Sequence, residues 1–288
     1  MNRQIMEFNP KDIKKLQLIK PHSHKGENGK VLVIGGSTLF HSASIWAAEL
    51  LAHFVDLVFY YSPALINRKI LLQSKKKFKN GIIICYEELE DYVQEADVIL
   101  LGTGMKRQIK NKQEDYEGKL THKLTNDLLK KYPKKKFVLD AGALQELELK
   151  NIKPQHILTP HRGEFNKLFP KYEQTKISKE IFNKVLQEYP ATYLLKNKGI
   201  DYVFSVKSNN SLQKVIGGNS GLIKGGTGDL LAALTTALYV KNNPVLVATC
   251  ASYVLKQSSQ ALYKIQGPYY TTTELLTQIP KIFWQLTK

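Results

Sequence analysis

Glycine, hydroxyl and carboxylate residues gather in one stretch of the chain, Gly217–Asp229, directly before an apolar run from Leu230 to Tyr239. Glycine permits positive φ angles and lets backbone N–H groups approach a ligand closely. A helix start leaves its first N–H groups unpaired and carries partial positive charge, so the turn Gly225–Gly228 predicts a cradle for phosphate. Asp229 follows in the first turn of the predicted helix. It could take a proton or hold a metal there, or it could simply be a helix cap.

Similar polar turns follow other short apolar runs, which are typical of strands buried on both faces. Open α/β sheets bind ligands beyond the carboxyl ends of their strands, so these turns should gather along one edge. Because several polar turns should meet at the same edge, we favour a functional role for Asp229 over a role as a helix cap. Asp140 could either serve the site or cap the turn that follows it. The runs and the residues after them are Val31–Ile34 before Gly35, Asp97–Leu101 before Gly102, Phe137–Leu139 before Asp140, and Ile157–Thr159 before His161 and Glu164.

The remaining elements alternate between strand and helix along most of the chain. This pattern predicts an α/β fold of three layers, with a mainly parallel sheet between helices, in one domain over residues 1–288. Residues 1–29 are expected to lie over the domain as an arm, Lys106–Gly118 to form a surface loop, and residues 208–211 to join two strands as a hairpin turn. Further strands are expected at Leu57–Tyr61, Ile82–Cys85, Tyr193–Leu195, Tyr202–Ser205 and Leu212–Ile216, and helices at Ala43–Phe54, Thr121–Tyr132, Phe165–Phe169, Ser178–Tyr189, Pro244–Tyr263 and Thr271–Leu286.

Composition limits the classes of partner. The formal net charge is +17, but the chain has only four arginines, and its lysines are scattered. This favours a solvated basic surface over a nucleic-acid site, an alternative that a salt-dependent gel shift would test. No segment reaches the roughly 18 uninterrupted apolar residues of a membrane span, and the N-terminus has no apolar signal core. Cys85 and Cys250 are isolated, as in a reducing cytoplasm, so we expect a cytoplasmic protein with no membrane or nucleic-acid partner.

Three stretches resemble, in the right order, the signatures of the ADP-dependent NAD(P)H-hydrate dehydratases, which have the ribokinase-like fold. They are Lys25–Ser37, Thr159–Glu164 and Gly218–Asp229. The Gly-Gly-Thr-Gly-Asp within the third stretch is shared by ribokinase-like enzymes broadly, whereas the first two are more specific to the dehydratases. The resemblance extends from about residue 21 to the C-terminus. It implies a standalone dehydratase domain that assembles as a homo-oligomer, commonly a tetramer.

The implied reaction is the dehydration of hydrated NADH or NADPH with ADP or ATP as phosphoryl donor and Mg²⁺. The ring hydroxyl is a poor leaving group, and phosphorylation converts it into a phosphate that departs readily. Such a transfer needs mainly positioning and charge neutralisation. Two alternatives stay open: a kinase of the same fold that phosphorylates a small alcohol, and a relative that binds nucleotide without catalysis.

The resemblance also implies roles for individual residues. Asp229 is expected to be the base and to contact the substrate together with Ala43, Gly104 and His161. Glu164 is expected to contact Mg²⁺ through water. The expected nucleotide-binding residues are Lys196, Lys198, Gly199, Asn219, Gly225, Gly226, Thr227 and Gly228.

The chain departs from the family pattern at several places. Leu195–Gly199 carries two extra residues within the usual Leu-Lys-Gly, so either Lys196 or Lys198 could be the family's lysine. Gly142 stands where the family has a second aspartate, and Lys106 stands where it has a glycine. The segment Phe40–Ser44 also differs from the usual Tyr-x-Gly-Ala-Pro. Most of these changes concern the substrate side of the site.

Overall fold

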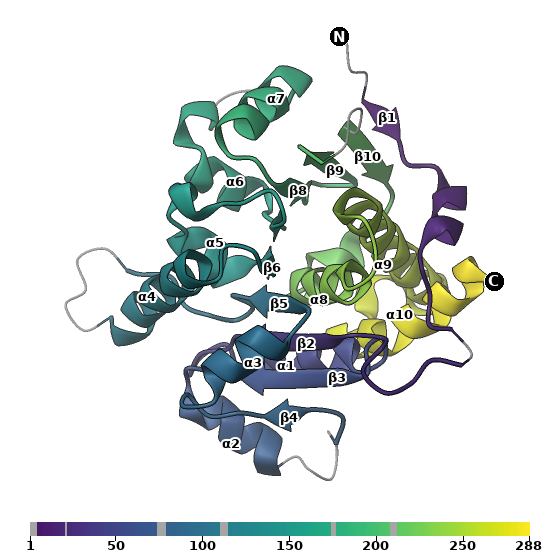
Figure 1. The fold of residues 1–288 in the computed structure, drawn as a ribbon. Coiled ribbons are helices and arrows are strands. Elements are labelled where there is room, and N and C mark those ends of the chain that lie inside the picture. Colours follow the sequence, from purple (N-terminus) through teal and green to yellow (C-terminus); the bar gives the residue numbers. More distant parts are fainter. Residues whose placement is uncertain (1–4, 21, 74–78, 110–114, 174–176, 208–211) are drawn as a thin grey trace.

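A ten-stranded sheet forms the centre of the computed structural model, which describes residues 5–20, 22–73, 79–109, 115–173, 177–207 and 212–288 (Figure 1). The strand order is β1-β10-β9-β8-β7-β6-β5-β2-β3-β4. Within this sheet β9 runs antiparallel to both neighbours, and the other adjacent strands are parallel. The strands are β1 (Met6–Glu7), β2 (Lys30–Ile34), β3 (Leu57–Tyr61), β4 (Ile82–Ile83), β5 (Val98–Leu101), β6 (Lys136–Leu139), β7 (Ile157–Leu158), β8 (Thr192–Leu195), β9 (Ile200–Ser205) and β10 (Leu212–Ile216).

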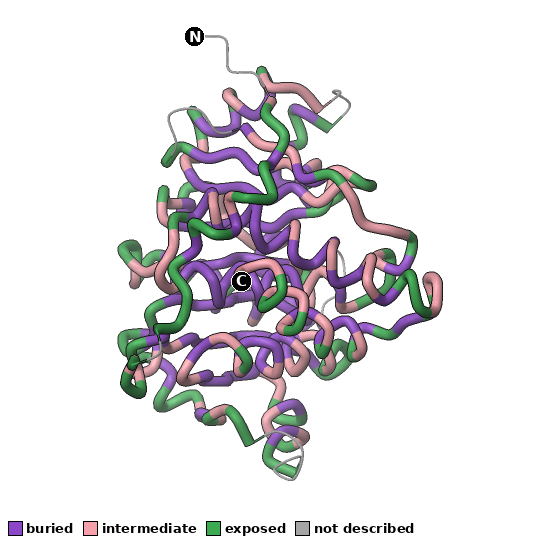
Figure 2. The backbone as a smooth tube through the Cα atoms, turned by 90° about the vertical axis from the view of Figure 1, so that its right-hand side faces the viewer, coloured by how far each residue is buried: buried purple, intermediate pink, exposed green. Residues whose placement is uncertain are grey.

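Helices cover both faces of the sheet, because its strands are apolar at consecutive positions. Val31 and Val33 of β2 pack into one core, while Leu32 and Ile34 pack into the other. The first core holds α1 (His41–Leu51), α8 (Thr227–Tyr239), α9 (Pro244–Gln266) and α10 (Thr272–Thr287). The second holds α3 (Leu89–Glu95), α4 (Tyr116–Lys131), α5 (Ala141–Glu146), α6 (Arg162–Leu168) and α7 (Lys179–Glu188). Figure 2 shows the buried backbone concentrated in the middle of the molecule.

This architecture confirms the predicted three layers and mainly parallel sheet, with local corrections. Helices α2 (Leu65–Gln73), α3 and α5 were not predicted from the sequence. The stretch Lys106–Gly118 is not loop throughout, since α4 begins at Tyr116, where the Asp115 carboxylate accepts a capping hydrogen bond from Gly118 N at 3.2 Å. Residues 208–211, the expected hairpin turn, lie outside the described residues, but the two strands that flank them pair antiparallel as predicted.

The N-terminal arm is partly built into the domain. β1 adds an edge strand beside β10, and a 3₁₀ helix, Pro10–Lys15, follows it. Phe8 and Ile13 are buried in the core that contains α9 and α10, and the Phe8 ring lies 5.3 Å from that of Tyr253. Among the described helices, none is both long enough and apolar enough to cross a membrane.

Candidate active site

Three strands deliver polar side chains to one point at the carboxyl edge of the sheet. Asp140 follows β6, and its carboxylate Oδ1 lies 2.9 Å from the Nζ of Lys196, which follows β8. Thr159, after β7, donates its hydroxyl to the same oxygen at 2.7 Å. Asp140 stands at the N-cap of α5 but makes no capping bond with its side chain. Its carboxylate is therefore engaged with Lys196 and Thr159 instead of the helix.

The N-terminus of α8 meets this point. Gly226 is the N-cap residue with φ of 94°, and a Cβ there would overlap the indole of Trp46, so the turn requires glycine. The Thr227 hydroxyl donates to the carbonyl oxygens of Leu222 at 2.8 Å and Lys224 at 3.0 Å, which fixes the loop that enters the helix. A Cβ placed on Gly228 would lie 3.4 Å from Lys196 Nζ. The first turn of α8 and the lysine ammonium thus face the same small region, which suits an anion.

Asp229 is the third residue of α8 and is half-buried. Because Gly226 occupies the N-cap, the cap interpretation of Asp229 is wrong. Burial and the negative charge of Asp140 raise the pKa of Asp229 to about 7, although Lys196 opposes the shift. Burial also disfavours the ammonium of Lys196, yet Asp140, Glu164 and Asp229 together hold the pKa of this lysine above its ordinary value. Asp229 is therefore a carboxylate poised to exchange a proton near neutral pH, beside a fixed positive charge.

His161 and Glu164 have a structural task at the start of α6. His161 Nδ1 accepts a hydrogen bond from Glu164 N at 3.2 Å, and Glu164 Oε2 accepts one from His161 N at 2.9 Å. This reciprocal pair is a capping box, with histidine in place of the usual serine or threonine. Burial raises the pKa of Glu164, Lys196 lowers it and Asp140 raises it further, so this carboxyl group belongs to the same electrostatic cluster.

A cleft of about 720 Å³ opens beside this cluster, and its size suits a nucleotide. Seven of the residues expected to bind nucleotide or substrate line it: His161, Lys196, Lys198, Gly199, Asn219, Thr227 and Gly228. Lys198 is exposed, whereas Lys196 points to Asp140, so the two lysines of the altered Leu195–Gly199 segment occupy different environments. Gly225 and Gly226 precede α8 and do not line the cleft themselves.

Ala43 and Gly104, two further expected substrate contacts, lie together and, like Asp229, are not among the residues that line that cleft. Gly104 follows β5, and Ala43 lies in α1, which follows the neighbouring strand β2. A Cβ on Gly104 would stand 3.0 Å from the Cβ of Ala43. Glu117 ties the two turns together, since its carboxylate accepts hydrogen bonds from Thr38 N at 2.7 Å and Thr38 Oγ1 at 2.8 Å and pairs with Lys106 Nζ at 2.5 Å. The sequence interpretation missed the role of Glu117. The lysine at position 106, where the family has a glycine, was the one signal that could have indicated an acidic partner.

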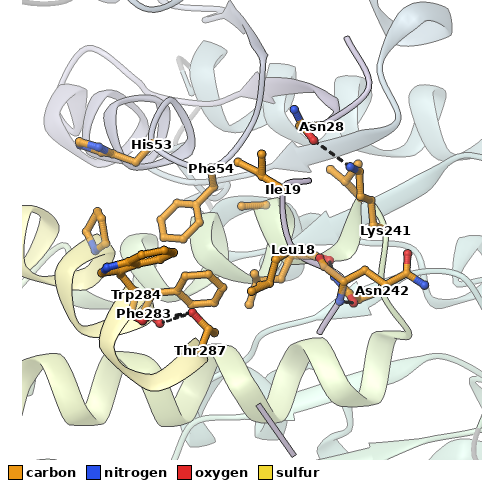
Figure 3. A pocket seen from close by; sticks show the side chains of 15 residues that line it. Leu18, Ile19, Asn28, His53, Phe54, Lys241, Asn242, Phe283, Trp284 and Thr287 are labelled. Carbon is orange, nitrogen blue, oxygen red and sulfur yellow. Dashed lines mark hydrogen bonds between the residues drawn. The ribbon is translucent and has the colours of Figure 1, made fainter. Parts of the chain in front are cut away.

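Figure 3 shows a second cavity, of about 260 Å³, that does not belong to this site. The rings of Phe54, Phe283 and Trp284 lie on one side of it, and on the other Lys241 donates to Asn28 Oδ1 at 2.9 Å. Asn28 precedes β2 and Lys241 follows α8, which places the cavity at the amino ends of the strands, opposite Asp229. Among the described residues that line it none is acidic, and its ionisable side chains are those of His53 and Lys241.

Solved structures define the class of the fold. A ribokinase-like superfamily protein from Enterococcus faecalis superimposes with a TM-score of 0.82 at 20% identity, covering 98% of this chain and 96% of its own. An ADP/ATP-dependent NAD(P)H-hydrate dehydratase from Bacillus subtilis, co-crystallised with ATP/Mg²⁺, superimposes with a TM-score of 0.76 at 18% identity and covers 98% of this chain and 99% of its own. The chain therefore has the α/β ribokinase-like fold, as the sequence resemblance implied.

Residues 31–281 match the family model described as NAD(P)H-hydrate dehydratase, and the chain belongs to that family. It is 31% identical over 277 residues to the bifunctional NAD(P)H-hydrate repair enzyme Nnr of Methanocaldococcus jannaschii, covering 94% of this chain but only 51% of that protein. It is 28% identical over 280 residues to the ADP-dependent (S)-NAD(P)H-hydrate dehydratase of Nitrosopumilus maritimus, covering 91% of each. The chain thus spans about half the length of the bifunctional relative.

Proposed function

We propose that this chain is a hydro-lyase that dehydrates hydrated NADH or NADPH with ADP or ATP as phosphoryl donor. The observation that carries the proposal is the position of Asp229, whose pKa is raised to about 7, at the glycine-led start of α8 beside the Lys196–Asp140 pair. Membership of the family supplies the reaction class, and the adjoining cleft supplies room for the nucleotide.

The proposed mechanism gives each group one task. The N–H groups at the start of α8 and the Lys196 ammonium neutralise charge on the transferring phosphoryl group. Asp229 takes the proton of the ring hydroxyl while the hydroxyl oxygen bonds to the terminal phosphorus of the nucleotide. The bond from that phosphorus to its bridging oxygen breaks, which releases AMP when the donor is ADP. Expulsion of the new phosphate and loss of a ring proton then restore the double bond, and no electrons are exchanged with another reagent.

The site fits an indirectly held Mg²⁺. Within the described residues, no group of three or more histidine, cysteine, aspartate or glutamate side chains could hold a metal ion by itself. Mg²⁺ usually keeps several waters and is held by substrate phosphates with few carboxylates. Glu164 is the residue proposed to contact it through water, since this buried carboxylate shares the field of Lys196 and Asp140. When bound, the ion would neutralise charge on the nucleotide phosphates.

Turnover can be tested directly by incubating the protein with hydrated NADH and either ADP or ATP and following absorbance near the usual NADH maximum. We expect recovery of NADH with at least one donor. Asp229→Asn should abolish this recovery while the dissociation constant for the nucleotide changes no more than a few-fold. Asp127→Asn is the matched control, because Asp127 is an exposed surface residue of α4 that pairs with Lys123.

No recovery by the wild-type protein with either donor would overturn the proposal. A phosphorylated product that accumulates without losing phosphate would instead favour the kinase alternative. A folded wild-type protein that binds nucleotide and never turns over would favour the non-catalytic relative. The homo-oligomer expected by resemblance, commonly a tetramer, and the cytoplasmic location stay proposals, and light scattering would test the first.

A further inference from the structure

A buried charge pair lies in the wall of the cleft, away from the Asp229 cluster. Lys256 of α9 is 4% exposed, and its Nζ lies 3.3 Å from Oδ2 of Asp201 in β9. The same ammonium donates to the carbonyl oxygen of Gly217 at 3.0 Å. Asp201 also accepts from the Ser252 hydroxyl at 2.7 Å and from Asn197 N at 3.2 Å. The pair thus joins α9 and β9 to the two loops that border the cleft.

Such a pair needs an explanation other than stability, because desolvation offsets most of the attraction between two buried charges. Both residues line the cleft. An ammonium carries three donors. One of them bonds the carbonyl oxygen of Gly217, and the ion pair with Asp201 engages the same nitrogen at 3.3 Å. Since Lys256 lines the cleft, we take its remaining donor capacity to face a ligand there. Lys256 is also the one charged residue within the sequence Pro244–Tyr263. A lone charge in an otherwise uncharged stretch is the signal by which the sequence could have indicated this residue.

Lys196, which is half-buried, and Lys256, which is buried, serve different regions of the cleft. Lys196 faces Asp140 and the start of α8, where the phosphate cradle is. Lys256 lies instead against the end of β10, where Cβ atoms on Gly217 and Gly218 would stand 3.8 Å and 3.7 Å from its methylene carbons. Apolar side chains complete this part of the cleft lining, which suits a flat ring: Leu222, Leu231 and Leu255.

We infer that Lys256 recognises the nucleoside half of the nucleotide, by donating a hydrogen bond to an acceptor atom of the purine base or the ribose. Lys196 and the start of α8 then hold the phosphates. Asp201 orients Lys256 through their ion pair. The inference rests on the proposed function, since it concerns the same nucleotide.

The test compares binding of ADP, adenosine and pyrophosphate by calorimetry to the wild type, Lys256→Met and the double variant Asp201→Asn/Lys256→Met. Methionine keeps the volume of the lysine stem, and the double variant avoids an unpaired buried carboxylate if the single variant does not fold. Loss of one hydrogen bond from a charged donor should weaken ADP and adenosine by about 10-fold or more. Pyrophosphate lacks a nucleoside, so its binding loses no hydrogen bond in the variants. Their affinity for pyrophosphate should therefore stay within about 2-fold of that of the wild type.

Pyrophosphate binding weakened as much as ADP binding would overturn the inference, because Lys256 would then be a phosphate ligand. Unchanged affinity for ADP and adenosine in a folded variant would assign the pair a purely structural role and would also overturn it. A wild-type protein that binds ADP but fails to turn over would contradict only the proposed function. A wild-type protein that binds neither ADP nor ATP would contradict both.

Discussion

At the scale of single residues, the central feature is how one charge sets the ionisation of another. Asp229 is drawn toward its neutral form by burial and by Asp140, and toward its ionised form by Lys196. A free carboxylate would be ionised at neutral pH but would be a weak base. Raising its pKa to about 7 makes it a stronger base while leaving a substantial ionised fraction near neutrality.

This ionisation predicts a pH profile. Since Asp229 must be ionised to accept the proton, kcat should rise with pH through about 7 and level off above it. Asp140→Asn removes a negative neighbour and should shift the midpoint to lower pH, whereas Lys196→Met removes a positive neighbour and should shift it to higher pH. Steady-state kinetics from pH 5 to 9 at saturating substrates, with roughly half-unit steps, would resolve these shifts. Midpoints that move in the same direction in both variants would contradict the assignment.

The same carboxyl group links activity to stability. Because the folded-state pKa of Asp229 is above its unfolded value, protonation favours the folded state. That contribution is fully present below the unfolded pKa, near 4, and is lost as pH rises through about 7. Because asparagine does not ionise, the Asp229→Asn variant should not lose stability in this way as the pH rises. It should therefore be more stable than the wild type at pH 8, a gain typical of active-site substitutions.

At the scale of elements, the entrance to α8 combines a conformational and a steric requirement. Gly226 has φ of 94° and touches Trp46 of α1 and Thr272 of α10, so three helices meet at one glycine. The adjacent Gly225 is exposed, with open space where a Cβ would be placed. The two glycines look equivalent in the sequence but have different structural tasks.

This contrast makes Gly225→Ala a matched control for Gly226→Ala. A left-handed conformation costs an alanine about 1–2 kcal/mol, and displacement of Trp46 adds to it, so Gly226→Ala should lower the free energy of unfolding by about 2 kcal/mol or more. Gly225→Ala should stay within about 0.5 kcal/mol of the wild type. Urea unfolding followed by circular dichroism measures both. Equal losses in the two variants would show that the φ angle and the Trp46 contact do not govern this turn.

At the scale of the whole molecule, one sheet joins the two cores, the N-terminal arm and the residues of the site. Both cores share its strands, and the arm adds β1 to its edge. Asp140, Lys196 and the start of α8 are far apart in sequence and meet only because β6, β7 and β8 are adjacent and parallel. We propose on this basis that residues 1–288 form one cooperative domain.

A single domain predicts a single unfolding transition. Scanning calorimetry should give one endotherm, and far-UV circular dichroism and tryptophan fluorescence should report the same midpoint, because disruption of the shared sheet exposes both cores. Trp46 packs on the α8 side, whereas Tyr193 is buried in the opposite core, so near-UV signals sample both. Two resolved transitions would show that the two layers unfold independently.

The sequence by itself determined the layers and the position of Asp229. Short, continuous apolar runs that end in glycine, such as Val31–Ile34, favour central strands, and glycines before an apolar helix indicate an anion cradle, because both features depend on local composition and period. The short helices α2, α3 and α5 escaped prediction, since each is held by tertiary packing more than by its own pattern.

Only the tertiary structure decided which charges meet. It paired the Asp140 carboxylate with Lys196, although Asp140 is the N-cap residue of α5, and it separated the environments of Lys196 and Lys198. It also brought Lys256 to Asp201, which lies 55 positions earlier in the chain, a pairing that no local pattern encodes. Electrostatic partners depend on distance in space, and that distance is fixed by the order of strands in the sheet.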